Sequence, residues 1–160
     1  MSEILEALYR GDAETAHRLA DGADLDVFEA AALGETPRLR GLLDEDPARA
    51  NAFGDDGFHP LGLACFFGRL DAARVLLERG ADVNALSRNE HVQTAAIHAA
   101  AASGETDADA KTRYELVKLV LDHGADPNLP QPGGFRAIDA ARQNGDERLE
   151  RLLKERGAAD

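Results

Sequence analysis

The side chains of this sequence that could carry out chemistry include one cysteine, Cys65, and five histidines. His59 precedes Cys65 by six residues, and a histidine that takes the proton of a thiol creates the nucleophile that thiol enzymes use. Cys65, however, falls in an apolar stretch, at the position where a small residue would close a packed pair of helices. A thiol enzyme that uses Cys65, His59 and a neighbouring carboxylate is therefore the weaker alternative.

The remaining chemistry-bearing residues do not form a recognisable site. The sequence contains no C-x-x-C, no H-E-x-x-H and no paired-histidine motif, so it predicts no metal site. The pair Gly133-Gly134 lacks the preceding strand and the following lysine of a phosphate-binding loop. Carboxylates are plentiful, but the pattern places none in an apolar pocket that would raise its pKa. We therefore expect no catalytic residue, no metal and no cofactor.

The stretch Asp56–Ala85 predicts two helices, one over about 60–67 and one over about 70–79. Gly68 and Gly80 stand where each helix would have to end in a left-handed residue. Each helix carries apolar residues on one face: Leu61, Ala64 and Cys65 on the first, and Ala72, Ala73, Val75, Leu76 and Leu77 on the second. One such pair cannot bury its apolar face alone, so the pattern predicts further copies.

Five copies fill the chain, the first of them degenerate. Their approximate limits are residues 1–25, 26–52, 53–85, 86–128 and 129–160. The closing glycines Gly124 and Gly157 are 33 residues apart, whereas Gly80 and Gly124 are 44 apart. The fourth copy therefore carries extra residues, which alignment places near 86–94, as a lengthened turn, and near 105–112, as a polar loop that we expect to be mobile.

This unit resembles the ankyrin repeat. The matching residues are Gly57-x-x-Pro60-Leu61, Gly68, Leu76-Leu77, Gly80-Ala81-Asp82-Val83-Asn84 and Gly124-Ala125-Asp126-x-Asn128. The resemblance covers essentially the whole chain. It implies one all-α domain, residues 1–160, which folds as an ankyrin-repeat α-solenoid of stacked helix–turn–helix units with short β-turn or hairpin loops. It also implies a non-catalytic protein–protein interaction module that binds a protein partner through its concave groove and turn tips.

The helix starts depart from the family pattern. Where the family usually has Thr-Pro-Leu-His, this sequence has His59-Pro-Leu-Gly62, Ala95-Ala-Ile-His98 and Arg136-Ala-Ile-Asp139. The capping threonine is absent and the histidine is kept only once, so we expect some of the hydrogen bonds at these helix starts to be missing. The predicted consequence is a lower stability with the same fold.

Composition narrows the class of partner. The net charge of −12 argues against nucleic acid or an anionic membrane. Residues 1–60 hold 14 acidic and 5 basic residues, a net charge of −9, which suits a solubilising cap on a repeat array. The alternative function is an acidic decoy or inhibitor of a basic, nucleic-acid-binding protein. The single cysteine and the absence of a signal-peptide pattern predict a cytoplasmic monomer. The high content of alanine, aspartate and arginine suggests a bacterial source.

The groove that the resemblance implies would be lined by the turns and by two positions near the end of each first helix. In chain order these positions are Tyr9-Arg10, Ala32-Leu33, Phe66-Phe67, Ala102-Ser103 and Gln143-Asn144. Four of the six phenylalanines fall in the central unit and its leading turn, with small residues on their carboxyl side that would leave a shallow pocket. We predict that the partner-binding residues are Tyr9, Leu33, Phe53, Asp55, Asp56, Phe58, Phe66 and Phe67, with Arg88, Glu90 and His91 from the lengthened turn. The alternative, that these phenylalanines pack into the core, stays open.

Overall fold

The computed structural model describes residues 1–104 and 107–160, and in this part of the chain all the regular secondary structure is helical. The helices are α1 (Glu3–Tyr9), α2 (Ala13–Ala20), α3 (Val27–Leu33), α4 (Thr36–Glu45), the 3-10 helix η1 (Pro47–Asn51), α5 (Pro60–Phe66), α6 (Leu70–Glu78), α7 (Ala96–Ala101), α8 (Asp107–Asp122), α9 (Ala137–Gln143) and α10 (Glu147–Glu155). No helix among the described residues has the length and apolar character needed to cross a membrane.

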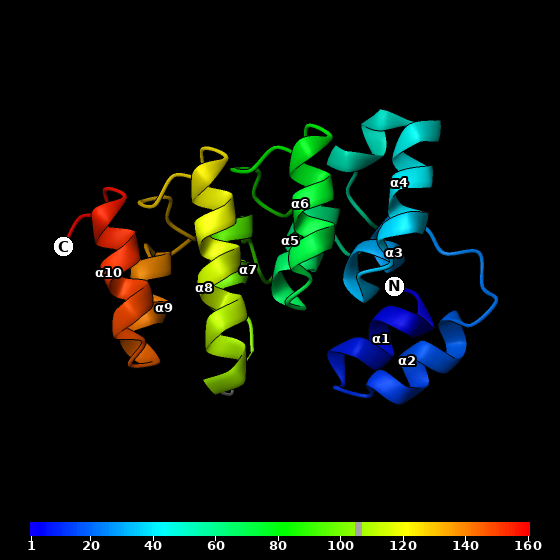
Figure 1. The fold of residues 1–160 in the computed structure, drawn as a ribbon, viewed down its shortest axis with the longest axis horizontal. Helices are drawn as coiled ribbons and strands as arrows, with labels where there is room; N and C mark the ends of the chain where they lie inside the picture. Colours follow the sequence, from blue (N-terminus) through cyan, green and yellow to red (C-terminus); the bar gives the residue numbers. More distant parts are fainter. Residues whose placement is uncertain (105–106) are drawn as a thin grey trace.

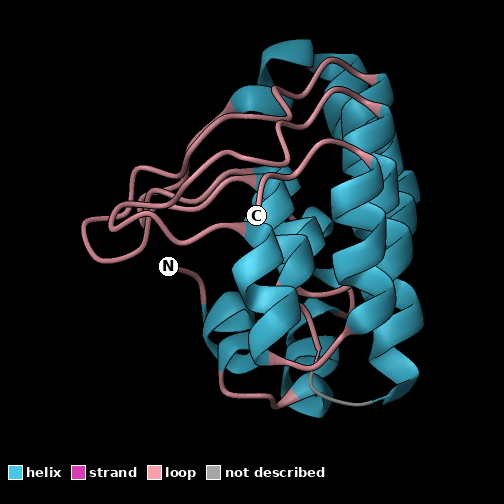
Figure 2. Ribbon diagram, turned by 90° about the vertical axis from the view of Figure 1, so that its left-hand side faces the viewer, coloured by secondary structure: helices cyan, strands magenta, loops and turns pink. Residues whose placement is uncertain are grey.

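The α-helices come in antiparallel pairs that stack side by side (Figure 1). From the second pair onward, α3, α5, α7 and α9 form an inner layer, and α4, α6, α8 and α10 form an outer layer. The turns that follow α4, α6 and α8 project to the same side, beyond the inner layer (Figure 2). This arrangement confirms the predicted all-α solenoid of stacked helix–turn–helix units.

The core between the layers is built from alanine, leucine, isoleucine and valine. Leu61, Leu76, Ile97 and Leu116 are almost completely buried, and alanines at the same level let neighbouring helices approach closely. The tight reversals inside the pairs need glycine: Gly34, for example, ends α3 in the left-handed conformation with φ 77°. The start of α3 is stabilised by a reciprocal capping box between Asp26 and Glu29.

Three asparagines join each unit to the next, from the second unit to the fifth. The side chain of each one accepts a hydrogen bond from a backbone N–H and donates one to a backbone carbonyl in the glycine-containing turn that ends the following unit. The two distances are 2.7 and 3.0 Å for Asn51 with Asp82 and Gly80, 2.9 and 3.2 Å for Asn84 with Asp126 and Gly124, and 2.8 and 2.9 Å for Asn128 with Ala159 and Gly157. The asparagine of the closing motif therefore fixes the register between units.

The expectation that some hydrogen bonds are missing at the helix starts is confirmed in part, because the N-cap residues Ala95 and Arg136 make no side-chain cap hydrogen bond. Other side chains keep the remaining bonds. His59 is the N-cap residue of α5, whereas His98 is the third residue of α7. Each ring nevertheless accepts a backbone N–H at Nδ1 and donates from Nε2 to a carbonyl in the following turn. The distances are 3.0 and 3.0 Å for His59 with Gly62 and Ala85, and 3.0 and 2.6 Å for His98 with Ala95 and Leu129. In the last unit Asp139 Oδ2 accepts from the backbone N–H of Arg136 at 2.8 Å. Different side chains thus supply the cap in each unit.

The prediction of a mobile loop at 105–112 is wrong for the residues of this segment that the structure describes. Residues 105–106 lie outside them, but α8 begins at Asp107 and runs for 16 residues, compared with 9 in α6. The polar stretch therefore lengthens the outer helix of the fourth unit, which extends beyond its neighbours in Figure 1. Its alanine and lysine residues are good helix formers, and this local preference explains the result.

Arg113 anchors the lengthened helix to its surroundings. It is buried, and its Nη1 donates to the carbonyls of Ser103 at 2.8 Å and Gly104 at 3.1 Å. Its Nε lies 3.3 Å from Oδ2 of Asp146, the residue whose other oxygen caps α10. One side chain therefore connects the end of α7, the helix α8 and the start of α10.

The first pair is set differently from the rest. Figure 1 shows α1 and α2 below α3 and outside the row that the other pairs form. Ile4, Leu5 and Leu8 are buried, and α1 packs against α3. The end of α1 brings Tyr9 over the third unit, where its ring centroid lies 5.2 Å from that of Phe67 and 5.9 Å from that of Phe66. The degenerate first unit thus contributes a side chain to the middle of the inner face.

Candidate protein-binding groove

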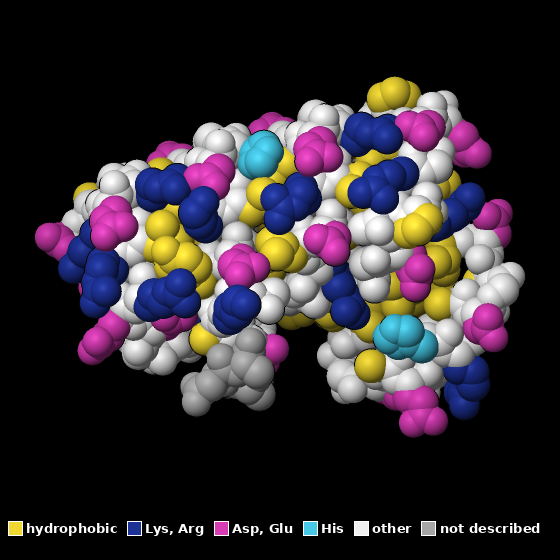
Figure 3. Space-filling model, in the orientation of Figure 1, with side chains coloured by type: hydrophobic (Ala, Val, Ile, Leu, Met, Phe, Trp, Pro, Cys, Tyr) yellow, Lys and Arg dark blue, Asp and Glu magenta, His cyan; other side chains and the backbone are white. Residues whose placement is uncertain are grey.

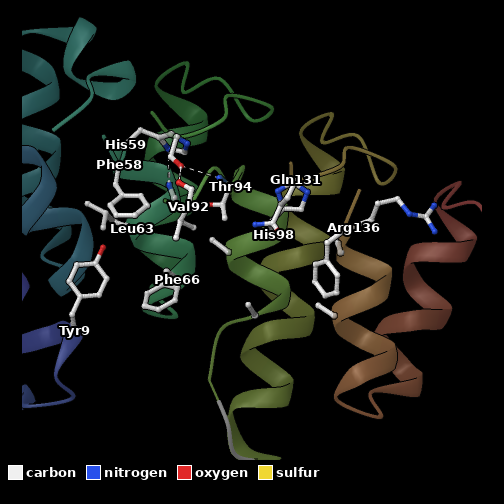
Figure 4. Close-up of a pocket in the computed structure, with 17 residues that line it drawn as sticks. Tyr9, Phe58, His59, Leu63, Phe66, Val92, Thr94, His98, Gln131 and Arg136 are labelled. Carbon is white, nitrogen blue, oxygen red and sulfur yellow. Dashed lines mark hydrogen bonds between the residues drawn. The ribbon is translucent and has the colours of Figure 1, made fainter. Parts of the chain in front are cut away.

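A pocket of about 360 Å³ runs along the inner face of the stack, over α5, α7 and α9. One wall is formed by aromatic residues of the first and third units, and the other by the turns that precede α7 and α9. Figure 4 shows Tyr9, Phe58 and Phe66 on one side of this space and Arg136 on the other. We call this feature the inner groove.

The inner groove collects nearly all the exposed large apolar side chains of the described residues. Five such side chains are exposed in that part of the chain, with exposed fractions of 53% for Met1, 37% for Tyr9, 44% for Phe66, 45% for Val92 and 37% for Phe135. All of them except Met1 line this one pocket. Such a concentration of apolar surface is typical of an interaction site, whereas isolated exposed residues are ordinary.

The floor of the groove follows from the helix register. Leu63 of α5, Ala99 of α7 and Ala140 of α9 occupy equivalent positions, and Phe66 aligns with Ala102 one turn further along. The change from leucine to alanine removes bulk over α7 and α9, and the change from phenylalanine to alanine removes more over α7. The pocket lies over these alanines, on the carboxyl side of the aromatic cluster, where the sequence predicts it.

The lengthened turn at 86–94 is held in one conformation by its own polar residues. Oγ of Ser87 donates to the carbonyl of Val92 at 2.9 Å and accepts from the backbone N–H of Thr94 at 3.0 Å. Oδ1 of Asn89 accepts from the backbone N–H of His91 and of Val92, at 2.9 and 3.0 Å. These bonds place Val92 in the wall of the inner groove.

The same turn also docks onto the preceding turn. The backbone N–H of Arg88 donates to the carbonyl of Gly57 at 2.7 Å, and Nδ2 of Asn89 donates to the carbonyl of Asp56 at 2.7 Å. Gly57 has φ 83°, and a Cβ atom there would lie 2.5 Å from the carbonyl carbon of Arg88. Only glycine allows this close approach.

The predicted site residues fall into three groups. Tyr9, Phe58 and Phe66 line the inner groove. Phe67 is partly buried against the core, although its ring meets that of Phe66 edge-on at 5.0 Å. Leu33 is a correction: it is 6% exposed, because α1 packs against α3 and closes that end of the inner face.

The third group lies at the turn tips. Phe53, Asp55, Asp56, Arg88, Glu90 and His91 line a separate, open recess between the turns of the third and fourth units. The guanidinium carbon of Arg88 lies 4.0 Å from the ring centroid of Phe53, in a cation–π arrangement. The site residues therefore line two adjoining features rather than one continuous aromatic surface.

Val92 and Phe135 line the inner groove but are absent from the predicted set of partner-binding residues. Phe135 precedes Arg136 as Phe58 precedes His59, so its place at a turn of the groove follows from alignment of the two units. Val92 lies in the lengthened turn, which has no counterpart in the other units, and its position depends on the hydrogen bonds of Ser87 and Asn89. Nothing in the sequence pattern indicates that position.

The titratable groups of the site argue against a thiol enzyme that uses Cys65 and His59. Burial raises the pKa of the Cys65 thiol to about 12, and the side chain is completely buried. Both ring nitrogens of His59 are engaged with the backbone, and burial lowers its pKa. The thiol-enzyme alternative therefore has neither an accessible thiolate nor a free base. Burial, with a smaller contribution from the Asp56 charge, raises the pKa of Tyr9 to about 12.

Comparison with known proteins agrees with this architecture. The family model described as "Ankyrin repeat" matches residues 56–88, which include most of the central unit. "Ankyrin repeat and SAM domain-containing protein 6" of Rattus norvegicus is 32% identical over 130 residues, which are 80% of this chain and 14% of that protein. "Putative E3 ubiquitin-protein ligase XBAT35" of Arabidopsis thaliana is 29% identical over 129 residues, 80% of this chain and 26% of that protein.

The chain thus spans only a minor part of the relatives that it matches. "Serine/threonine-protein kinase VIK" of Arabidopsis thaliana is matched over 17% of its length, at 34% identity. The ligase and kinase activities in these names belong to those proteins. The relatives named here are eukaryotic, so they lend no support to a bacterial source. What they share with this chain is the repeat, and the chain belongs to the ankyrin repeat family.

Proposed function

We propose that this chain is a non-catalytic binding module that holds a protein partner in the inner groove. Ankyrin repeats generally mediate protein–protein interactions. The proposal goes further and assigns the contact to α5, α7, α9 and the turn at 86–94. The observation that carries it is the convergence of Tyr9, Phe66, Val92 and Phe135 on one pocket.

The energetic reason is that these side chains remain partly in water. Covering an exposed apolar side chain contributes about 25 cal/mol per Å² of surface removed from water, so a few such residues dominate the affinity of an interface. The surrounding backbone is rigid before binding. It is held by the helix caps, by the asparagine hydrogen bonds between units, and by the contact of the turn at 86–94 with the preceding turn. A preformed surface loses little conformational entropy on association.

The test is partner capture by a variant that keeps the fold and spoils the groove. Phe66→Asp/Val92→Asp places two charges in the apolar pocket at positions that are 44% and 45% exposed, so the core is not disturbed. Ala13→Asp/Ala48→Asp is the matched control, since both alanines are exposed, lie outside the pocket and receive the same charge. Circular dichroism establishes that both variants are folded.

Affinity for the captured partner is then measured by titration. We expect the groove variant to bind at least about tenfold more weakly, because burial of an unpaired carboxylate costs a few kcal/mol. The control variant should bind as the unchanged chain does. Equal affinity of the folded groove variant and the control would refute the proposal.

A further inference from the structure

Resting on that proposed function, we propose that the occupant of the inner groove is a linear segment of a partner protein with apolar anchors and a neighbouring basic residue. The apolar side chains fill the pocket over α7, and the lysine or arginine binds the carboxylates at the tips of the adjoining turns. Three features of the molecule support this occupant: the size of the groove, its continuity with the turn tips, and the charges found there.

The size of the groove favours a segment. About 360 Å³ lies at the lower end of the range for ligand pockets, and it accommodates a few side chains rather than the surface of a folded domain. Tyr9 bounds the pocket at the end of the first unit, while Gln131 and Phe135 bound it at the other end. A segment that runs along the stack can place successive anchors over α5, α7 and α9.

The groove is continuous with the turn tips. Val92 lines both the inner groove and a recess of about 240 Å³ that it shares with Glu90 and His91. Glu90 and His91 in turn line the larger recess that contains Asp55 and Asp56. A segment anchored beside Val92 therefore passes close to these carboxylates as it leaves the groove.

The turn tips carry uncompensated negative charge. Asp55, Asp56 and Glu90 face one guanidinium, that of Arg88, which gives a net charge of −2 from three acidic groups and one basic group. Arg88 stacks on Phe53, and within the described residues none of the three carboxylates has an ion-pair partner. Oδ1 of Asp56 accepts from the backbone N–H of Phe58, which leaves Asp55 and Glu90 as the free acceptors.

The outer face shows the opposite arrangement. Acidic and basic side chains are interspersed over the outer helices (Figure 3). Arg79 pairs with Asp44, and Arg156 pairs with Asp122 at 2.7 Å. Acidic and basic side chains therefore alternate over the outer helices, whereas three carboxylates and one guanidinium line the recess beside the apolar groove. This contrast favours a basic partner at that position.

The experiment is a selection of random 16-residue peptides, displayed on phage, against the full chain at low salt. We expect enriched peptides to carry two or more apolar residues with a lysine or arginine close by. Synthetic versions of the enriched peptides are then titrated against three variants, namely Phe66→Asp, Asp55→Lys/Glu90→Lys and Glu78→Lys/Glu155→Lys. The last is the matched control, because Glu78 and Glu155 are exposed on outer helices and have no ion-pair partner among the described residues.

The reversal of Asp55 and Glu90 should weaken peptide binding by roughly tenfold at low salt, and the loss should shrink as salt increases. The control should bind with unchanged affinity, although its net charge changes equally. Equal loss in the control, enrichment of neutral or acidic peptides, or no enrichment would overturn the inference. Loss of binding in Phe66→Asp alone would also overturn it while leaving the groove function intact. Peptide binding that survives Phe66→Asp would instead contradict the proposed function.

Discussion

Mild acid should weaken the fold through His59 and His98. Nδ1 of each ring accepts a backbone N–H, from Gly62 and from Ala95, at 3.0 Å in both cases. Each ring must therefore be neutral with its proton on Nε2, where it donates to the next turn. Protonation at Nδ1 would set two N–H groups against each other and break the cap of the helix.

The sign of the effect follows from the direction of the pKa shifts. Burial is the main reason that the pKa of His59 and of His98 lies below the ordinary value. The unfolded chain then binds protons more readily, near pH ~6.5, than the folded chain does. The contribution to stability is complete above that pH, and it falls as the pH drops through ~6.5 towards the lowered pKa of the folded state. Each histidine contributes a slope of at most about 1.4 kcal/mol per pH unit.

The assay is urea unfolding at a series of pH values between about 7.5 and 5. In His59→Asn/His98→Gln, asparagine remains a good N-cap and glutamine can still reach back as in a capping box, but neither side chain titrates. We expect the fall in unfolding free energy to flatten in this variant. His91→Gln serves as the control, because His91 is exposed and outside the core. An unchanged slope in the double variant would refute the reasoning.

Three further predictions concern other joints and groups. Asn84→Ala should lower the unfolding free energy by about 1–2 kcal/mol, measured in urea, because it removes two hydrogen bonds between units; Asn144→Ala, on an exposed residue, should have little effect. Gly57→Ala should destabilise the chain by more than ~1 kcal/mol and also weaken partner binding, since its Cβ would meet the backbone of Arg88 at 2.5 Å. Cys65 should react with a thiol reagent at neutral pH only as fast as the chain unfolds, because its pKa is about 12 and it is buried; fast labelling of the folded chain would contradict the structure.

The stacked architecture could be predicted from the sequence because the local signals for helix ends agree with the spacing of the repeats. Gly68 and Gly80 end helices where the pattern places them, and Asn84 joins units as its place in the closing motif would require. The caps were harder to predict. His59 stands where threonine was expected, and only geometry reveals that its ring reaches the same N–H and the next turn.

The site was predicted less completely than the fold. Phe58 and Phe66 follow from the repeat alignment and lie in the inner groove. Leu33 was misplaced because the degenerate first unit leaves the common register, and no pattern in one sequence shows that α1 would cover it. Val92 depends on the conformation of a turn that is not repeated, so periodicity carries no information about it.

Binding in the inner groove is tested most directly by the pattern of amide hydrogen exchange when the captured partner binds. We expect added protection in the turn at 86–94, in the carboxyl-terminal half of α5 and along α7 and α9, with no change on α4, α6 and α10. Protection confined to the outer helices, or to the acidic residues of α1 and α2 in a complex that dissociates at moderate salt, would contradict binding in the inner groove.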